Sequence, residues 1–91
     1  MDKIERGKRN LEKLRSIVDS REWRGRVTFW NPTHDDKITT TIHGDVSRLM
    51  VQLYDGLNAD NKESFLLHVA TYSGFLKLNA YVWPHATYRS A

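Results

Sequence analysis

The strongest pattern in the chain is KITTTIHGDVSRLMVQLYDGLNADNKESFLLHVATY, residues 37–72. Its first seven residues alternate in polarity and include five β-branched side chains, which predicts a strand over residues 37–43. Apolar residues then recur at three- and four-residue steps, a spacing typical of an amphipathic helix. These residues are Val46, Leu49, Met50, Leu53, Tyr54 and Leu57. We therefore predict a strand that leads directly into a helix.

Polar residues and glycines predict where the helices begin and end. Gly44 and Asp45 interrupt the strand, and Asp45 is a suitable N-cap for the first helix. Residues 58–61 predict a turn, after which Asp60 and Glu63 have the spacing of a capping box. The second helix carries the apolar residues Phe65, Leu66, Val69 and Tyr72. Gly74 is predicted to end it in a left-handed conformation.

The residues before this region predict a second strand and another helix. Residues 26–30 alternate, with Val27 and Phe29 on one face, and Asn31 and Pro32 end the strand. A loop of about six residues would join this strand to residues 37–43 as a hairpin. Residues 2–19 predict an amphipathic helix, whose first turns Gly7 weakens.

The residues that follow the second predicted helix also alternate in polarity. Residues 75–83 predict a third strand that joins the hairpin, and residues 85–91 predict a mobile tail. The whole chain then predicts one α+β domain over residues 1–91, with two layers and the element order α-β-β-α-α-β. We expect a small, mostly antiparallel three-stranded sheet with the helices on one face.

Composition narrows the function classes. The chain has 91 residues, of which 40% are hydrophobic and none is cysteine, so we expect a modest core without disulfides or thiolate sites. No run approaches the roughly 18 apolar residues of a membrane span, and the first residues are charged, so we expect a cytoplasmic protein. We find no catalytic signature, and expect a protein that is not an enzyme and binds no cofactor or metal.

Two surfaces carry the candidate partner-binding residues. The sheet face left uncovered by the helices would present aromatic, basic and hydroxyl side chains together, a composition common at binding hot spots. The candidates on this face are Trp30, Tyr81, Trp83, Lys37, Thr39 and Thr41, and the alternation places Arg26, Thr28 and His43 on the same face. The second surface is the basic side of the first helix, with Arg6, Arg9 and Lys13. Alternatively, the first helix or the tail covers the aromatic face and makes it core.

The strand and two helices of residues 37–72 resemble the ribbon-helix-helix family of DNA-binding modules. In that family, two chains pair their strands into a ribbon. The resemblance implies that Lys37, Thr39 and Thr41 enter the major groove of a duplex. It also implies a phosphate contact near Asn61 and Lys62.

We expect a small non-enzymatic binding or regulatory protein that contacts a protein or nucleoprotein partner through one of these surfaces. In size and composition the chain resembles inhibitors and adaptors encoded by phages and mobile elements. One alternative is a dimeric, ribbon-helix-helix-like DNA-binding regulator. Another is a single-stranded nucleic-acid binder that stacks bases on the aromatic side chains.

Overall fold

The protein forms four helices and one antiparallel pair of strands, in the order α-β-β-α-α-α. The structure is a computed structural model that describes residues 2–86, and the side chains of residues 2–81. The elements are α1 (Lys3–Asp19), β1 (Arg24–Asn31), β2 (Asp36–His43), α2 (Gly44–Asp55), α3 (Ala59–Val69) and α4 (Tyr72–Ala86). The predicted α+β class is confirmed, whereas the predicted third strand and element order are wrong. The predicted mobility of residues 87–91 concerns residues outside the described part.

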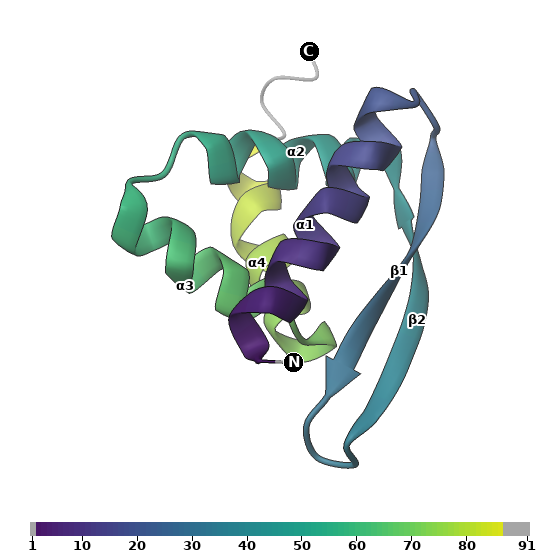
Figure 1. The fold of residues 1–91 in the computed structure, drawn as a ribbon. Coiled ribbons are helices and arrows are strands. Elements are labelled where there is room, and N and C mark those ends of the chain that lie inside the picture. Colours follow the sequence, from purple (N-terminus) through teal and green to yellow (C-terminus); the bar gives the residue numbers. More distant parts are fainter. Residues whose placement is uncertain (1, 87–91) are drawn as a thin grey trace.

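Figure 1 shows the hairpin on one side of the molecule and the four helices together on the other. The strands pair in a regular register in which Arg26 lies opposite Thr41, and Thr28 lies opposite Thr39. Because successive side chains point to opposite faces, Val27, Phe29 and Ile42 face the helices and are buried. The hairpin is therefore a two-stranded ribbon with one covered face.

Helix α1 begins at a side-chain cap and crosses α3 closely. The Asp2 carboxylate accepts a hydrogen bond from the backbone N–H of Glu5 at 2.8 Å, which satisfies one donor of the first turn. Leu11, Leu14 and Ile17 are buried on the inner side of the helix. Gly7 is buried as well. A Cβ at this position would overlap the carbonyl oxygen of Leu66, so Gly7 permits the close approach of α1 and α3.

Three helix-end predictions are wrong in detail. Helix α2 begins one residue earlier than Asp45, with His43 at the N-cap, because the chain passes from β2 into the helix without a turn. In α3 the cap is Asn58, whose side chain accepts a hydrogen bond from the N–H of Asn61 at 2.9 Å, and not Asp60. Gly74 lies inside α4, and its φ is not positive.

Helix α4 occupies the residues for which a third strand was predicted. Its start is marked by Thr71, whose Oγ1 accepts a hydrogen bond from the N–H of Gly74 three residues later, at 3.1 Å. Phe75 is buried, and Tyr72 and Leu78 are partly buried against the core. These three residues recur at three-residue steps, which fits a helix. The same segment also alternates in polarity like a strand, and the burial of one side of α4 favours the helix.

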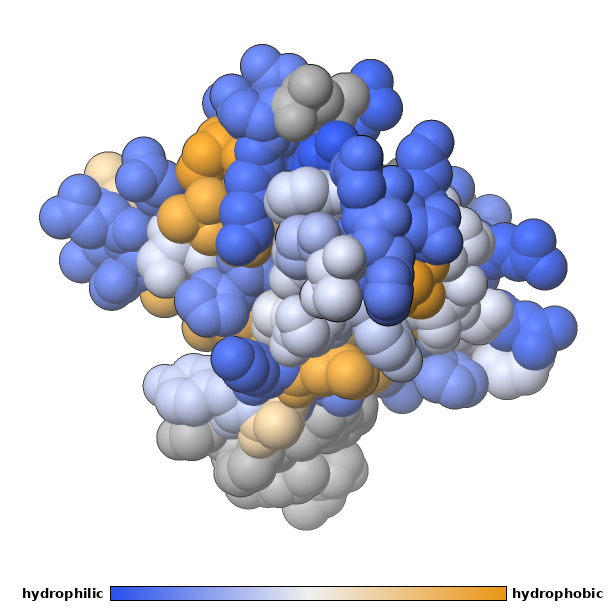
Figure 2. Space-filling model, turned by 90° about the horizontal axis from the view of Figure 1, so that it is seen from below, coloured by the Kyte–Doolittle hydropathy of each residue, from blue (hydrophilic) through white to orange (hydrophobic). Residues whose placement is uncertain are grey.

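All six elements contribute to one hydrophobic core. Its fully buried members include Leu14 from α1, Phe29 from β1, Met50 from α2 and Phe65 from α3. Figure 2 views the molecule from below, where hydrophobic areas are small and separated by hydrophilic side chains. Within the part of the chain that the structure describes, no helix is long and apolar enough to cross a membrane.

Candidate partner-binding surface

The outward side of the hairpin is the most distinctive surface that the structure describes. Alternation along β1 and β2 places eight side chains on it, and we call this set the ribbon face. Its members are Arg24, Arg26, Thr28, Trp30, Lys37, Thr39, Thr41 and His43. In register they form the cross-strand pairs Arg24–His43, Arg26–Thr41, Thr28–Thr39 and Trp30–Lys37. None of the eight is a carboxylate.

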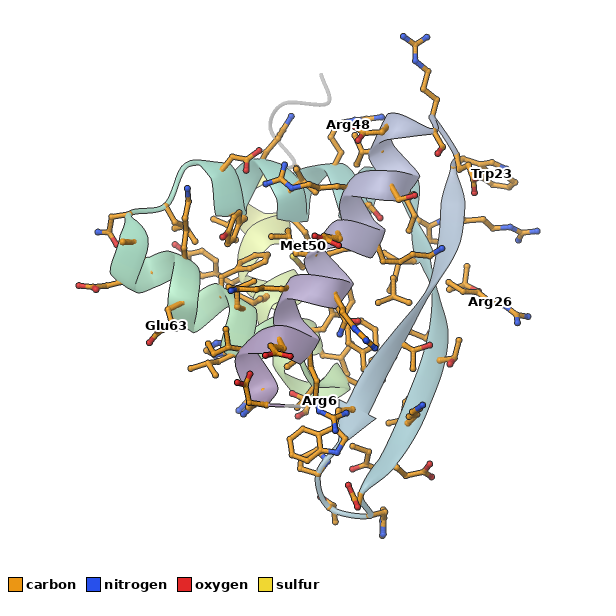
Figure 3. All side chains as sticks on the ribbon, in the orientation of Figure 1. Arg6, Trp23, Arg26, Arg48, Met50 and Glu63 are labelled. Atoms are coloured by element: carbon orange, nitrogen blue, oxygen red, sulfur yellow. The ribbon has the colours of Figure 1, made fainter. Side chains whose placement is uncertain are left out.

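The cations of the ribbon face are exposed. Figure 3 shows Arg26 pointing away from the helices, and Trp23 does the same at the start of the strand. Within the described residues, neither Arg26 nor Lys37 forms an ion pair. Arg24 stacks against Trp23, with its guanidinium carbon 5.2 Å from the ring centroid. In the part of the chain that the structure describes, no carboxylate forms an ion pair with Arg26 or Lys37.

A basic pocket adjoins one end of the ribbon face, between α1 and β1. It has a volume of about 410 Å³, and we call it the α1–β1 pocket. Its lining residues are Arg6, Arg9, Asn10, Thr28, Phe29, Trp30, Lys37 and Ala70. Three are cations, and none of the described lining residues is acidic. The pocket is therefore strongly positive for its size.

Contacts around Trp30 fix the wall of this pocket. The guanidinium carbon of Arg6 lies 4.6 Å from the centroid of the indole ring, within the range of a cation–π contact. The indole N–H donates a hydrogen bond to the Asp35 carboxylate at 3.3 Å. On the other side of the pocket, the buried Asn10 amide donates to the carbonyl of Val69 at 2.8 Å. Side chains from α1 and the hairpin are thus held in one arrangement.

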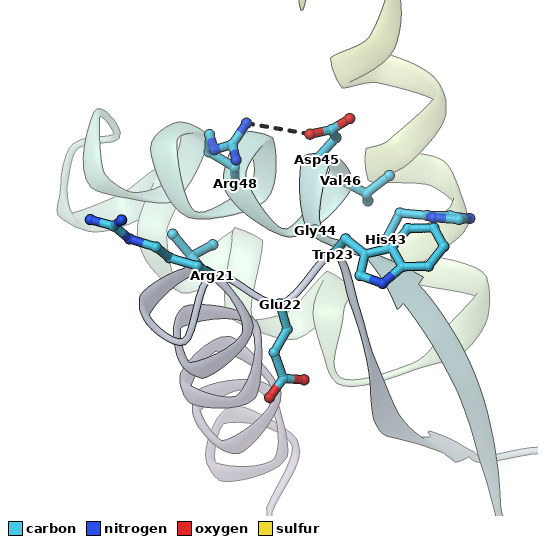
Figure 4. Close-up of a pocket in the computed structure, with 9 residues that line it drawn as sticks. Arg21, Glu22, Trp23, His43, Gly44, Asp45, Val46 and Arg48 are labelled. Carbon is cyan, nitrogen blue, oxygen red and sulfur yellow. Dashed lines mark hydrogen bonds and ion pairs between the residues drawn. The ribbon is translucent and has the colours of Figure 1, made fainter.

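A larger cavity lies at the opposite end of the ribbon, where α1 ends and α2 begins (Figure 4). Its volume is about 610 Å³, and its lining includes Arg21, Glu22, Trp23 and Arg48. The Asp45 carboxylate, which also lines it, forms an ion pair with Arg48 at 3.3 Å. Its lining contains two arginines and two carboxylates, whose charges offset each other. The positive potential that an anionic ligand would meet is therefore weaker here than in the smaller α1–β1 pocket.

Neither shifted pKa values nor clustered metal ligands mark a further site among the described residues. The Arg15 guanidinium donates two hydrogen bonds to Asp55, at 2.5 and 3.2 Å, and links α1 to α2. These bonds hold the pKa of the Asp55 carboxyl below its ordinary value and raise the pKa of Arg15. Both side chains lie on the surface, where such a pair has a structural role. No three His, Asp or Glu side chains within residues 2–81 are grouped as metal ligands.

The structure brings together some of the sequence-predicted site residues and separates others. Trp30, Lys37, Arg6 and Arg9 line one pocket, although the sequence placed them on two different surfaces. Thr39 and Thr41 are exposed on the adjoining ribbon face. Lys13 is exposed on α1 but does not line the pocket.

The predicted aromatic sheet face is wrong, because its third strand is a helix. Tyr81 belongs to α4 and is 58% exposed there. Trp83 also lies in α4, and its side chain is outside the described part. Among the eight residues of the ribbon face, Trp30 is the one tryptophan, tyrosine or phenylalanine.

Sequence reasoning missed two residues of this surface. The predicted strand begins at residue 26 and so excludes Arg24, although the alternation of Arg24, Arg26 and Thr28 indicates the longer strand. The apolar pattern does not identify Asn10 as a core residue because its side chain is polar, although it lies between Gly7 and Leu14 on the buried side of α1. Comparisons with protein-family models, curated proteins and solved structures found no match to this chain.

Proposed function

We propose that the protein is a small, non-enzymatic binding or regulatory protein that contacts a protein or nucleoprotein partner through the ribbon face. The single observation that supports this proposal most is the composition of the face: three Lys or Arg and three Thr among eight outward residues, with no carboxylate. An inhibitor or adaptor of this kind needs no catalytic groups of its own, only a surface that matches its partner.

The physical argument favours a partner with negative charge. Clustered cations focus a positive potential, which raises the rate of encounter with an anionic surface. Threonine hydroxyls then supply short hydrogen bonds at low cost in side-chain entropy, and Arg is enriched at binding hot spots. The hairpin lies on one side of the helices, so a partner reaches its outward face without displacing the core (Figure 1).

Charge reversal tests the proposal. We expect Arg26→Glu combined with Lys37→Glu to leave far-UV circular dichroism unchanged and to remove the partner from affinity capture, with and without nuclease treatment. Lys77→Glu is the matched control, because Lys77 is an exposed lysine on α4, outside the ribbon face. Equal loss of capture by the control, or unchanged capture by the double variant, contradicts the proposal.

A second candidate is a dimeric, ribbon-helix-helix-like DNA-binding regulator. The observation that favours it is the succession of β2, α2 and α3 within residues 36–69, with a short turn between the two helices. In the described residues β2 pairs on one edge with β1 and has no strand on its other edge. This candidate requires a dimer, and Thr39→Ala with Thr41→Ala would abolish duplex binding. A monomer by sedimentation equilibrium excludes it.

A further inference from the structure

The α1–β1 pocket gathers its cations from separate parts of the chain. Arg6 and Arg9 stand three residues apart on α1 and therefore lie on one side of the helix. Lys37 comes from β2, where it lies opposite Trp30. All three residues line this pocket, and guanidinium and ammonium groups are the usual ligands of phosphate oxygens.

The backbone of β1 adds a hydrogen-bond donor to the same pocket. The N–H of Trp30 points away from β2, since it donates to the carbonyl of Ala70 at 3.0 Å. Backbone groups alternate along an antiparallel strand, so the N–H of Thr28, two residues earlier, points to the same side. Thr28 lines the pocket. An anion there meets a main-chain donor as well as three cationic side chains.

Trp30 acts as a wall of this pocket more than as a stacking platform. It is half-buried, and the Arg6 guanidinium lies over its ring while its N–H is engaged by Asp35. A base would have to displace Arg6 from that ring face, whereas a phosphate group would gain from the same guanidinium. The chemistry of the pocket thus suits the phosphate of a ligand better than its base.

We propose that the α1–β1 pocket binds a backbone phosphate of a nucleic acid that lies along the ribbon face. This inference rests on the proposed function, because it takes the ribbon face as the contact surface and names the partner. A two-stranded ribbon fits the major groove of a duplex, and phosphate contacts beside the groove fix its register. The pocket lies at one end of the ribbon, where such a flanking contact is needed.

Salt dependence of binding provides the first test. The probe is a fluorescein-labelled 20-base-pair duplex, with its single strand as a second probe, measured by anisotropy between 50 and 200 mM salt. Each phosphate contact contributes about 0.9 to the slope of log K against log salt for a duplex. We expect Arg9→Ala to lower the slope by about this amount, and Arg9→Lys to restore it. Lys8→Ala is the matched control, because Lys8 is exposed on α1 and does not line the pocket.

An equal change of slope in Lys8→Ala and Arg9→Ala overturns the proposal, because the effect would then be net charge and not a local contact. Inorganic phosphate provides the second test, by NMR at constant ionic strength. We expect the side-chain N–H resonances of Trp30 and Arg9 to shift in the wild type, and the Trp30 indole N–H resonance to remain in place in Arg9→Glu. Absence of these shifts in the wild type overturns the proposal.

The failure of this inference and that of the proposed function give different results. Capture of a protein partner that depends on Arg26 and Lys37, without binding of either nucleic-acid probe, overturns the phosphate site and retains the ribbon face. Nucleic-acid binding that depends on Arg9 but not on Arg26 retains the phosphate site and overturns the ribbon face as the contact surface.

Discussion

Gly7 illustrates how a single residue determines the distance between two helices. From the sequence, this glycine was expected only to weaken the first turns of α1. In the structure it is buried at the crossing with α3, where the Leu66 carbonyl occupies the space that a side chain would need. The cost in helix propensity is thus offset by close packing, which sequence periodicity does not reveal because the partner helix lies about 60 residues away along the chain.

We expect Gly7→Ala to destabilise the protein by about 1–3 kcal/mol, although alanine favours helix formation, because two backbones would have to separate. Gly56→Ala is the matched control. A Cβ at Gly56 would meet the carbonyl oxygens of Gln52 and Leu53 at ordinary contact distances, 3.6 and 3.8 Å, and the φ of −88° at this residue suits alanine. That variant should gain about 0.4–1 kcal/mol. Urea unfolding followed by circular dichroism measures both, and an unchanged midpoint for Gly7→Ala would contradict the close-packing argument.

At the scale of elements, alternation predicted the hairpin correctly and α4 incorrectly. Strand β1 and strand β2 carry long polar and apolar alternation with many β-branched residues, and a turn with proline lies between them. Residues 75–83 alternate too, but Phe75 and Leu78 also fit a helical spacing, and few residues there are β-branched. The signal that separates the two cases is Thr71, whose Oγ1 accepts a hydrogen bond from the N–H of Gly74 and thereby marks the start of α4.

The candidate site was predictable only in parts. Arg6, Arg9, Trp30 and Lys37 were each recognised, because exposed basic and aromatic residues on one face of an element are visible in the sequence. That they line one pocket depends on where α1 lies relative to the ribbon. The position of α1 depends in turn on its contacts with α3, at Gly7 and at buried Asn10. Long-range packing of this kind leaves no local pattern.

The ion pair between α1 and α2 predicts a specific dependence of stability on pH. Hydrogen bonds from Arg15 lower the pKa of Asp55 in the folded protein below the ordinary value of 3.8. The stabilisation is therefore fully present above the unfolded-state pKa and is lost as the pH falls through the folded-state pKa. We expect the stability difference between the wild type and Asp55→Asn to be constant from pH 7 to about pH 5, and to shrink below pH 4.

Urea unfolding at a series of pH values measures this difference. Because both side chains are on the surface, 1 M salt should reduce it by screening. A difference that grows on acidification would have the opposite sign and would show that the folded-state pKa of Asp55 is raised.

For the molecule as a whole, the core is the feature that joins the hairpin to the helices. Each of the six elements contributes at least one buried side chain to the same cluster, so no group of elements has a core of its own. A chain of 91 residues with one shared core should unfold in a single cooperative transition. The organisation as one domain, predicted from length and composition, can be tested in this way.

Met50 is fully buried, and we expect Met50→Ala to cost about 2–5 kcal/mol, a large part of the roughly 5–15 kcal/mol that stabilises a small domain. In this variant, as in the wild type, far-UV circular dichroism and tryptophan fluorescence should agree on one midpoint, and the midpoint of the variant should be lower than that of the wild type. Leu76→Ala serves as the control, since Leu76 is 45% exposed, and should change stability by less than about 0.5 kcal/mol. Two separate transitions would show that the ribbon and the helices unfold independently.

Two tryptophans lie near the two ends of strand β1, so their fluorescence can report which end of the strand a partner contacts. Trp23, 73% exposed, precedes the strand, and half-buried Trp30 lies near its end, so seven residue steps separate them by roughly 23 Å. With Trp83 replaced by phenylalanine, iodide quenching would come mainly from Trp23. A bound partner that shields only one indole would then reveal, from the emission spectrum alone, at which end of the strand it is anchored.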